Sequence, residues 1–103
     1  MGWKIHKYTI GAGMANGCME LVWPKGSVPL AVGSQAGGFV LWGQVDTDQG
    51  EREVLAVDFV WTGQSVPDPQ ERTYLGTVQD QRLVFHVYVS REAMDRRAGN
   101  HGG

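Results

Sequence analysis

The closest approach to a metal site in this sequence is the run DTDQGE at residues 46–51, which places Asp46 and Asp48 two residues apart. Hard cations such as Ca²⁺ bind where several oxygen ligands converge. A calcium loop of the helix-loop-helix type needs a further Asp or Asn before the turn glycine and a bidentate Glu well beyond it, and this run lacks both. We therefore interpret residues 46–51 as a solvated turn between two strands and predict no metal site.

The histidine with the most informative surroundings is His86, in the run LVFHVY at residues 83–88. In a strand it would lie with Val84 and Tyr88, opposite the apolar row that contains Phe85. An imidazole there could act as an acid or base, but no Ser, Cys or carboxylate follows at a recognisable catalytic spacing. We interpret His86 as a hydrogen-bonded residue of a half-buried strand, so we predict no catalytic residue, no enzyme activity and no cofactor.

Cys18 is the single cysteine, and no motif places a base beside it. Free cysteine is usually a small buried apolar residue, and its nucleophilicity depends on a lowered pKa. We therefore expect Cys18 to be buried and inert.

A strand that ends in a polar loop offers a candidate binding site at residues 61–66, with the sequence WTGQSV. Thr and Gln side chains both donate and accept hydrogen bonds, and loops held by a rigid scaffold often bind ligands. The alternative is a purely structural turn, in which the glycine supplies a backbone angle that other residues resist. The candidate ligand- or partner-binding residues are Trp61, Thr62, Gly63, Gln64, His86 and Tyr88.

Four tryptophans could anchor an interface, but in a small core most are expected to pack inside. An exposed tryptophan would favour the interface reading.

Apolar residues alternate with period two along most of the chain, which predicts β-strands. The Gly37-Gly38 pair predicts a tight hairpin, and residues 79–82 predict a second one. Arg52–Thr62 is apolar on both faces, as in a buried central strand. The predicted strands are Trp3–Ile10, Cys18–Trp23, Val28–Gly33, Phe39–Val45, Arg52–Thr62, Tyr74–Val78 and Leu83–Val89.

This spacing predicts an all-β fold, a single antiparallel sandwich or small barrel of about seven strands. The β domain would span residues 1–89. Residues 90–103 would form a short helix, with Ser90 as its N-cap, and a flexible tail from Gly99.

Composition narrows the functional class. The chain has 103 residues and a formal net charge of -2, with its basic residues scattered, so we expect no nucleic-acid partner. The single cysteine and the lack of a leader or a long apolar segment favour a soluble cytoplasmic protein without a membrane partner.

The order of several short motifs resembles a family of small proteins of unknown function encoded by tailed bacteriophages and prophages. The resemblance covers about residues 3–88 and departs from the pattern at Gln64 and Ser65, where the family has His and Pro. The matching motifs are Trp3-Lys4, the turn at residues 24–27 followed by Leu30 and Val32, Leu41-Trp42 with Val45-Asp46, the loop at residues 61–66, Tyr74-Leu75-Gly76-Thr77, and residues 83–88.

The resemblance implies a phage accessory protein that binds a host protein or a small ligand in the host cytoplasm, with counter-defence or host takeover as its role. One alternative is a virion structural or decoration protein, which a stable symmetric homo-oligomer would indicate. Another is a sponge for a nucleotide signal, which a deep pocket lined by arginine and aromatic residues would indicate.

Overall fold

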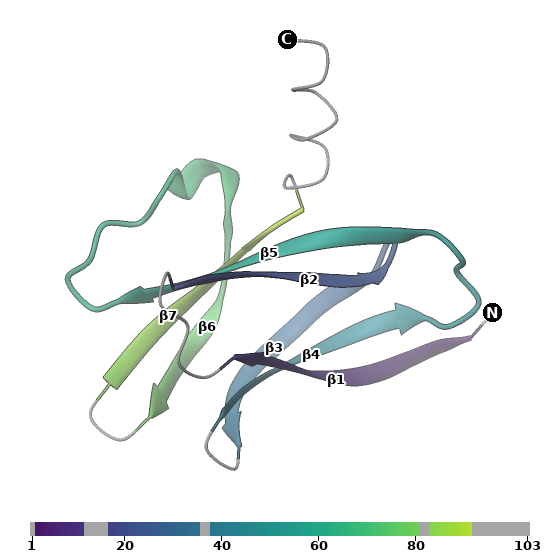
Figure 1. Cartoon of the computed structure of the whole chain (residues 1–103), viewed down its shortest axis with the longest axis horizontal. Coiled ribbons are helices and arrows are strands. Elements are labelled where there is room, and N and C mark those ends of the chain that lie inside the picture. Colours follow the sequence, from purple (N-terminus) through teal and green to yellow (C-terminus); the bar gives the residue numbers. More distant parts are fainter. Residues whose placement is uncertain (1, 12–16, 36–37, 81–82, 92–103) are drawn as a thin grey trace, which may run out of the picture.

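A computed structural model describes residues 2–11, 17–35, 38–80 and 83–91. These residues form an all-β protein with one short 3-10 helix (Figure 1). The elements in chain order are β1 (Trp3–Gly11), β2 (Cys18–Pro24), β3 (Val28–Gln35), β4 (Gly38–Asp46), β5 (Arg52–Trp61), η1 (Pro69–Glu71), β6 (Thr73–Asp80) and β7 (Leu83–Ser90).

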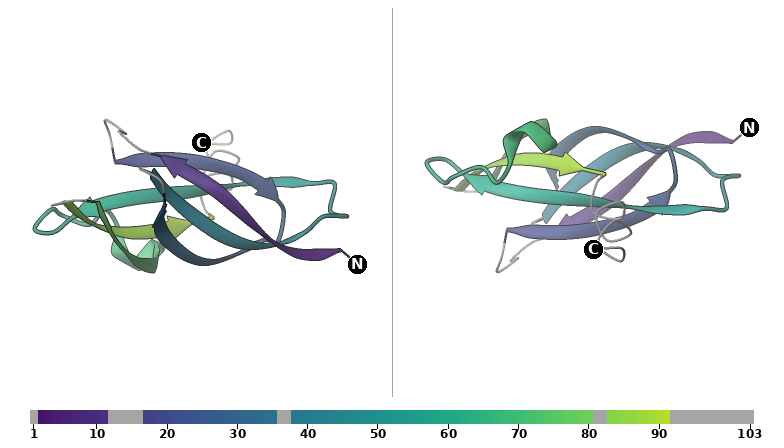
Figure 2. Two further views of the ribbon diagram at one scale, coloured as in Figure 1. Left: turned by 90° about the horizontal axis from the view of Figure 1, so that it is seen from below. Right: turned by 90° about the horizontal axis from the view of Figure 1, so that it is seen from above.

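The strands form two antiparallel sheets that face each other across the core (Figure 2). Sheet 1 has the order β1-β4-β3, and sheet 2 has the order β2-β5-β7-β6. The predicted all-β sandwich is therefore confirmed, and the barrel alternative is set aside because the two sheets remain separate. We call the side of each sheet that is turned away from the other sheet its outer face.

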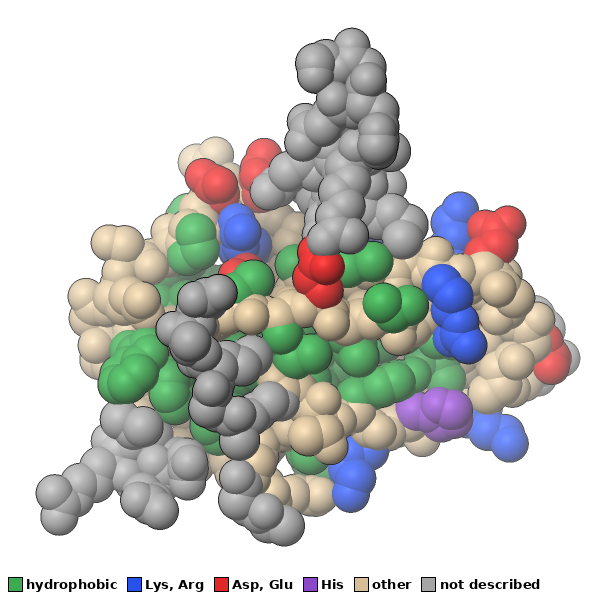
Figure 3. Space-filling model, viewed as in Figure 1, with side chains coloured by type: hydrophobic (Ala, Val, Ile, Leu, Met, Phe, Trp, Pro, Cys, Tyr) green, Lys and Arg blue, Asp and Glu red, His purple; other side chains and the backbone are tan. Residues whose placement is uncertain are grey.

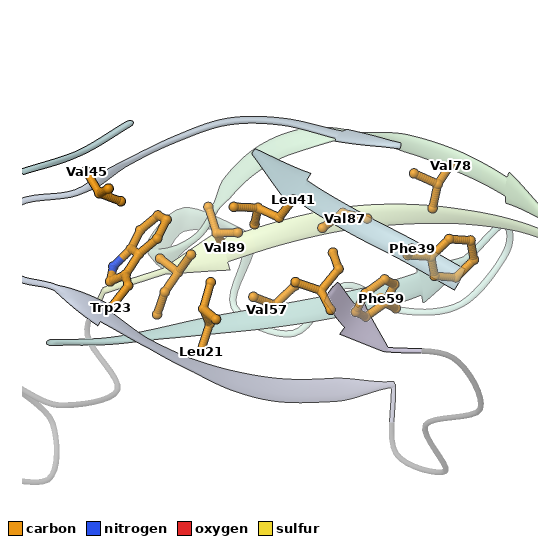
Figure 4. Packing of buried hydrophobic residues seen from close by; sticks show 12 residues of the cluster. Leu21, Trp23, Phe39, Leu41, Val45, Val57, Phe59, Val78, Val87 and Val89 are labelled. Atoms are coloured by element: carbon orange, nitrogen blue, oxygen red, sulfur yellow. The ribbon is translucent and has the colours of Figure 1, made fainter. Parts of the chain in front are cut away.

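The core contains the inward residues of both sheets, as the period-two pattern predicts (Figure 4). Trp23 lies at one end of the core near Val45, and Phe39 and Phe59 stack at the other end with ring centroids 5.6 Å apart. Phe85 meets both phenylalanines edge-on. Each of these aromatic side chains buries a large apolar area in the core.

Gly43 is required by the packing of Trp23. A Cβ at Gly43 would lie 2.6 Å from Cζ3 of the Trp23 ring, well inside van der Waals contact. The absent side chain lets the indole pack closely against β4 and become fully buried.

The sandwich is closed along one side and more open along the other. On the closed side the Ser34 hydroxyl of β3 donates a 2.9 Å hydrogen bond to the Gln79 carbonyl of β6. On the other side lie β1 and β2, one edge strand from each sheet. Figure 3 shows a band of hydrophobic side chains between them.

The strand predictions agree with the structure to within two residues at each end. β5 is the most buried strand and β3 pairs with β4, as predicted. β5 ends at Trp61, so Thr62 lies beyond the strand. β6 and β7 form the predicted second hairpin, but Gln79 and Asp80 belong to β6 rather than to its turn.

Ser90, predicted as a helix N-cap, is instead the buried last residue of β7. The rest of the predicted C-terminal helix and tail, residues 92–103, lies outside the described residues.

Candidate functional site

The outer face of sheet 2 carries a chain of hydrogen bonds that runs through His86. Nε2 of His86 is 2.9 Å from the Thr62 hydroxyl, and Nδ1 is 3.0 Å from the Thr77 hydroxyl. The Thr77 hydroxyl also bonds to the hydroxyl of Tyr74. We call these four residues, Thr62, His86, Thr77 and Tyr74, the hydroxyl–imidazole chain.

Strand register brings these side chains together. β7 lies between β5 and β6, so His86 is opposite Val60 on one side and Thr77 on the other. Two residues along, Tyr88 faces Tyr74, and their rings meet edge-on at a centroid distance of 5.5 Å. An irregularity in β6 between Tyr74 and Gly76 keeps both Tyr74 and Thr77 on this face.

The hydrogen bonds of the hydroxyl–imidazole chain orient the His86 ring and involve both of its nitrogens. A neutral imidazole donates through one nitrogen and accepts through the other, so two hydroxyls satisfy it fully. This is the half-buried, hydrogen-bonded histidine that the sequence favoured. Both ring nitrogens of His86 therefore lie against threonine hydroxyl groups.

Residues of the predicted binding loop at 61–66 make hydrogen bonds within their own turn. Gly63 has φ of +93°, a conformation that favours glycine. The Gln64 side-chain carbonyl accepts a 3.0 Å bond from the Trp61 backbone N–H, and the Gln64 N–H donates to the Trp61 carbonyl at 2.9 Å. Gln64 therefore closes the turn.

Trp61 lies apart from His86. Its register partner is Phe85, a core residue, and the two rings meet edge-on at 5.0 Å. Trp61 thus extends the aromatic core to the surface. The six predicted residues do not form one site, since Thr62, His86 and Tyr88 share an outer face while Trp61 points to the inner side.

Sequence reasoning missed an ion pair on the same outer face. Nε of Arg72 donates to Oδ2 of Asp58 at 2.7 Å, and the two side chains are only 12% and 9% exposed. This contact holds the segment after η1 against β5, and the hydrogen bond to Asp58 raises the pKa of Arg72. The available signal was the acidic Asp58 within the otherwise apolar strand β5.

Cys18 is exposed, so the expectation of a buried cysteine was wrong. It lies at the start of the edge strand β2, directly opposite Asp58. Partial burial and the hydrogen bond with Asp58 raise the pKa of its thiol to about 11. The thiol is therefore protonated at neutral pH and is a poor nucleophile.

We expect Cys18 to react slowly with iodoacetamide despite its exposure. At pH 8 the thiolate fraction should lie on the order of a hundredfold below that of an ordinary free cysteine. The reaction rate should keep rising past pH 9 towards the thiol pKa of about 11. Alkylation followed by mass spectrometry across this pH range measures it, with free cysteine as the control. A rate that levels off near pH 9 would contradict the assigned environment.

The predicted turn at residues 46–51 forms as expected. The Asp46 carboxylate accepts a 3.0 Å bond from the Asp48 N–H, and the Gln49 N–H donates to the Asp46 carbonyl. The Asp46 carboxylate thus caps the turn between β4 and β5. Within the described ranges, no group of three or more His, Cys, Asp or Glu side chains is placed to hold a metal.

A pocket of about 410 Å³ opens beside β3 and β7, at the point where the described chain ends. Its described lining includes Arg91 but no aromatic residue. Arg91 also forms a 2.8 Å ion pair with Glu53. The described part of this pocket therefore has the arginine but not the aromatic residue that we expect of a nucleotide sponge.

The outer face of sheet 1 carries several exposed apolar side chains. Trp3 and Ile5 of β1 lie on it, and the register aligns Ile5, Gln44 and Val28 in one row across the three strands. Trp3 and Trp61 are 46% and 47% exposed. Trp42 is half-buried on the outer face of sheet 1, and Trp23 is the one tryptophan of the four that lies in the core, so the expectation that most tryptophans pack inside was wrong.

Residues 1–97 match the family described as "Domain of unknown function (DUF7352)". The chain belongs to this family. The match spans all the strands from β1 to β7. No curated protein and no solved structure matches this DUF7352 chain.

Among the described residues of this DUF7352 protein, no helix is long and apolar enough to span a membrane.

Proposed function

We propose that this protein is a non-enzymatic binding protein and that the outer face of sheet 1 contacts a partner protein. The observation that carries the proposal is the exposure of Ile5 and Trp3 on the edge strand β1. Ile5 is 63% exposed.

Apolar side chains of this size normally lie inside a domain. Ile5 and Val28 flank Gln44 in one row of the sheet, and Trp42 lies in the next row. Leu30 adds a further exposed apolar side chain on β3. Aromatic and aliphatic side chains grouped on one exposed face are typical of the centre of a protein interface. A face of this kind can supply part of the roughly 800 Å² that one partner contributes to a standard interface.

The resemblance to phage and prophage proteins supplies a context for this proposal. In that context the protein is an accessory factor that acts in the host cytoplasm on a host defence or metabolic protein. A stable homo-oligomer that copurifies with virus particles would instead favour a structural component of the virion.

Ile5→Lys is expected to abolish capture of the partner protein, because the charged side chain would have to be desolvated inside the interface. Val22→Lys is the matched control, since Val22 is a β-branched residue on an edge strand of the other sheet and is 58% exposed. Both exposed substitutions should change the free energy of unfolding by no more than about 0.5 kcal/mol.

Native mass spectrometry of tagged protein purified from a bacterial host measures the captured partner. Loss with Ile5→Lys and retention with Val22→Lys would support the proposal. Equal capture by both variants, or a bare homo-oligomer in every sample, would overturn it.

A further inference from the structure

The edge of β1 that faces away from β4 is unpaired within the described part of the chain. β1 is one of the two edge strands of sheet 1 and pairs only with β4 in the described structure. In an edge strand, alternate residues leave their backbone N–H and C=O groups without strand partners. Such an edge can accept an extended peptide as an added strand.

The charged side chains of β1 are all basic. Its sequence, WKIHKYTIG, includes Lys4, His6 and Lys7 and no acidic residue, although the chain as a whole has a net charge of -2. The Lys7 ammonium is 3.0 Å from the Gln35 amide oxygen, and the ion pairs found among the described residues involve neither Lys4 nor Lys7. Blue and purple basic side chains flank the hydrophobic band on the β1 side in Figure 3. The positive charge of this strand is therefore not neutralised by a carboxylate in the described structure.

We infer that the free edge of β1 binds an extended, acidic segment of a partner protein as an additional strand of sheet 1. This inference rests on the proposed function, because it names the chemistry of the partner that the neighbouring apolar face contacts. Alternate residues of β1 face opposite sides, and Lys7 shares the outer face with Trp3 and Ile5. Acidic side chains of an alternating added strand would therefore lie opposite Lys4 and His6, where unlike charges stabilise cross-strand pairs. Ile5 and Trp3 would meet its apolar residues on the outer face.

A second copy of this chain fits the edge less well. Pairing β1 with another β1 would bring Lys4, His6 and Lys7 of both chains together, with no acid on either strand. Like charges that face each other across strands are destabilising, and edge lysines are a common defence against self-association. The charges that oppose self-pairing are the ones that an acidic strand complements.

The test uses two synthetic probe peptides, each as long as the nine-residue β1. One alternates valine with glutamate, and the control alternates valine with lysine. We expect the acidic peptide to bind the full chain with a Kd on the order of 0.1–1 mM and to slow amide hydrogen exchange along β1, while the basic peptide does not bind. NMR titration and hydrogen exchange measure both effects.

A charge-reversed variant tests the role of Lys4. Lys4→Glu should weaken binding of the acidic peptide by roughly tenfold, because it replaces an attraction with a contact between like charges. Lys25→Glu is the matched control, because it makes the same change of charge outside β1 and should leave acidic-peptide binding unchanged. Equal binding of the two peptides, protection away from β1, or insensitivity to charge reversal would overturn the inference.

Failure of this inference can be told from failure of the proposed function. If Ile5→Lys abolishes partner capture but neither peptide protects β1, the outer face binds a partner and the edge does not. If the acidic peptide binds β1 selectively but Ile5→Lys leaves capture intact, the proposed role of the outer face fails.

Discussion

Trp23→Ala is expected to lower the free energy of unfolding by about 3–5 kcal/mol, the usual range for removing a large aromatic side chain from a core. Trp23 is fully buried, and its ring fills the space that Gly43 leaves against β4. Tyr8 packs on it edge-on at a centroid distance of 5.9 Å. Because β1 and β4 both contact this ring through Tyr8 and Gly43, the resulting cavity would loosen sheet 1 as well as β2.

Chemical denaturation of the variant measures this loss, and Trp3→Ala is the control. Trp3 is a tryptophan of the same size that lies on the surface, so its removal should cost about 1 kcal/mol or less. Trp23→Phe should cost less than Trp23→Ala, because it keeps an aromatic ring and removes a buried indole N–H that has no partner among the described residues. A loss below about 1 kcal/mol for Trp23→Ala would contradict its assigned place in the core.

Arg72→Leu is expected to destabilise the protein by about 3 kcal/mol, because it leaves the Asp58 carboxylate without its cation on a largely buried surface. The double variant Asp58→Val with Arg72→Leu should recover most of this loss, since no buried charge then remains without a partner. Denaturant unfolding of both single variants and the double variant gives the coupling energy.

Lys25→Ala is the control for an exposed ion pair. It breaks the contact between Lys25 and Glu51, whose side chains are both exposed, and should cost at most about 0.5 kcal/mol. If the two single variants and the double variant show simply additive losses, the Asp58–Arg72 contact does not have the role that we assign to it.

Local sequence patterns predicted the strands well because strand formation depends on a pattern that is visible over a few residues. Val57 and Phe59 alternate with Asp58 and Val60 in β5, and both sets are buried. The hairpin between β3 and β4 could be predicted because a glycine pair separates two apolar runs. The division of the strands between two sheets could not, because β2 pairs with β5 and β5 with β7 across long separations in the sequence.

The candidate site was predictable only in part, for the same reason. Alternation along β7 placed His86 and Tyr88 on one face correctly. The hydrogen-bond partners of His86 come from the end of β5 and from β6, so they depend on register and on the irregularity between Tyr74 and Gly76. Trp61 was grouped with His86 from its place in the loop, whereas the pleat of β5 directs it to the opposite side.

By itself, the sequence determined that this is a β protein and which residues alternate between the two faces of each strand, since those properties are local. Only the tertiary structure decided which of these faces and edges remain exposed. Trp3 and Ile5 are apolar residues of a regular β-strand, and nothing in the sequence around them distinguishes them from core residues. They lie on the surface because β1 is an edge strand and because they occupy the outer face of sheet 1, which none of the described strands covers.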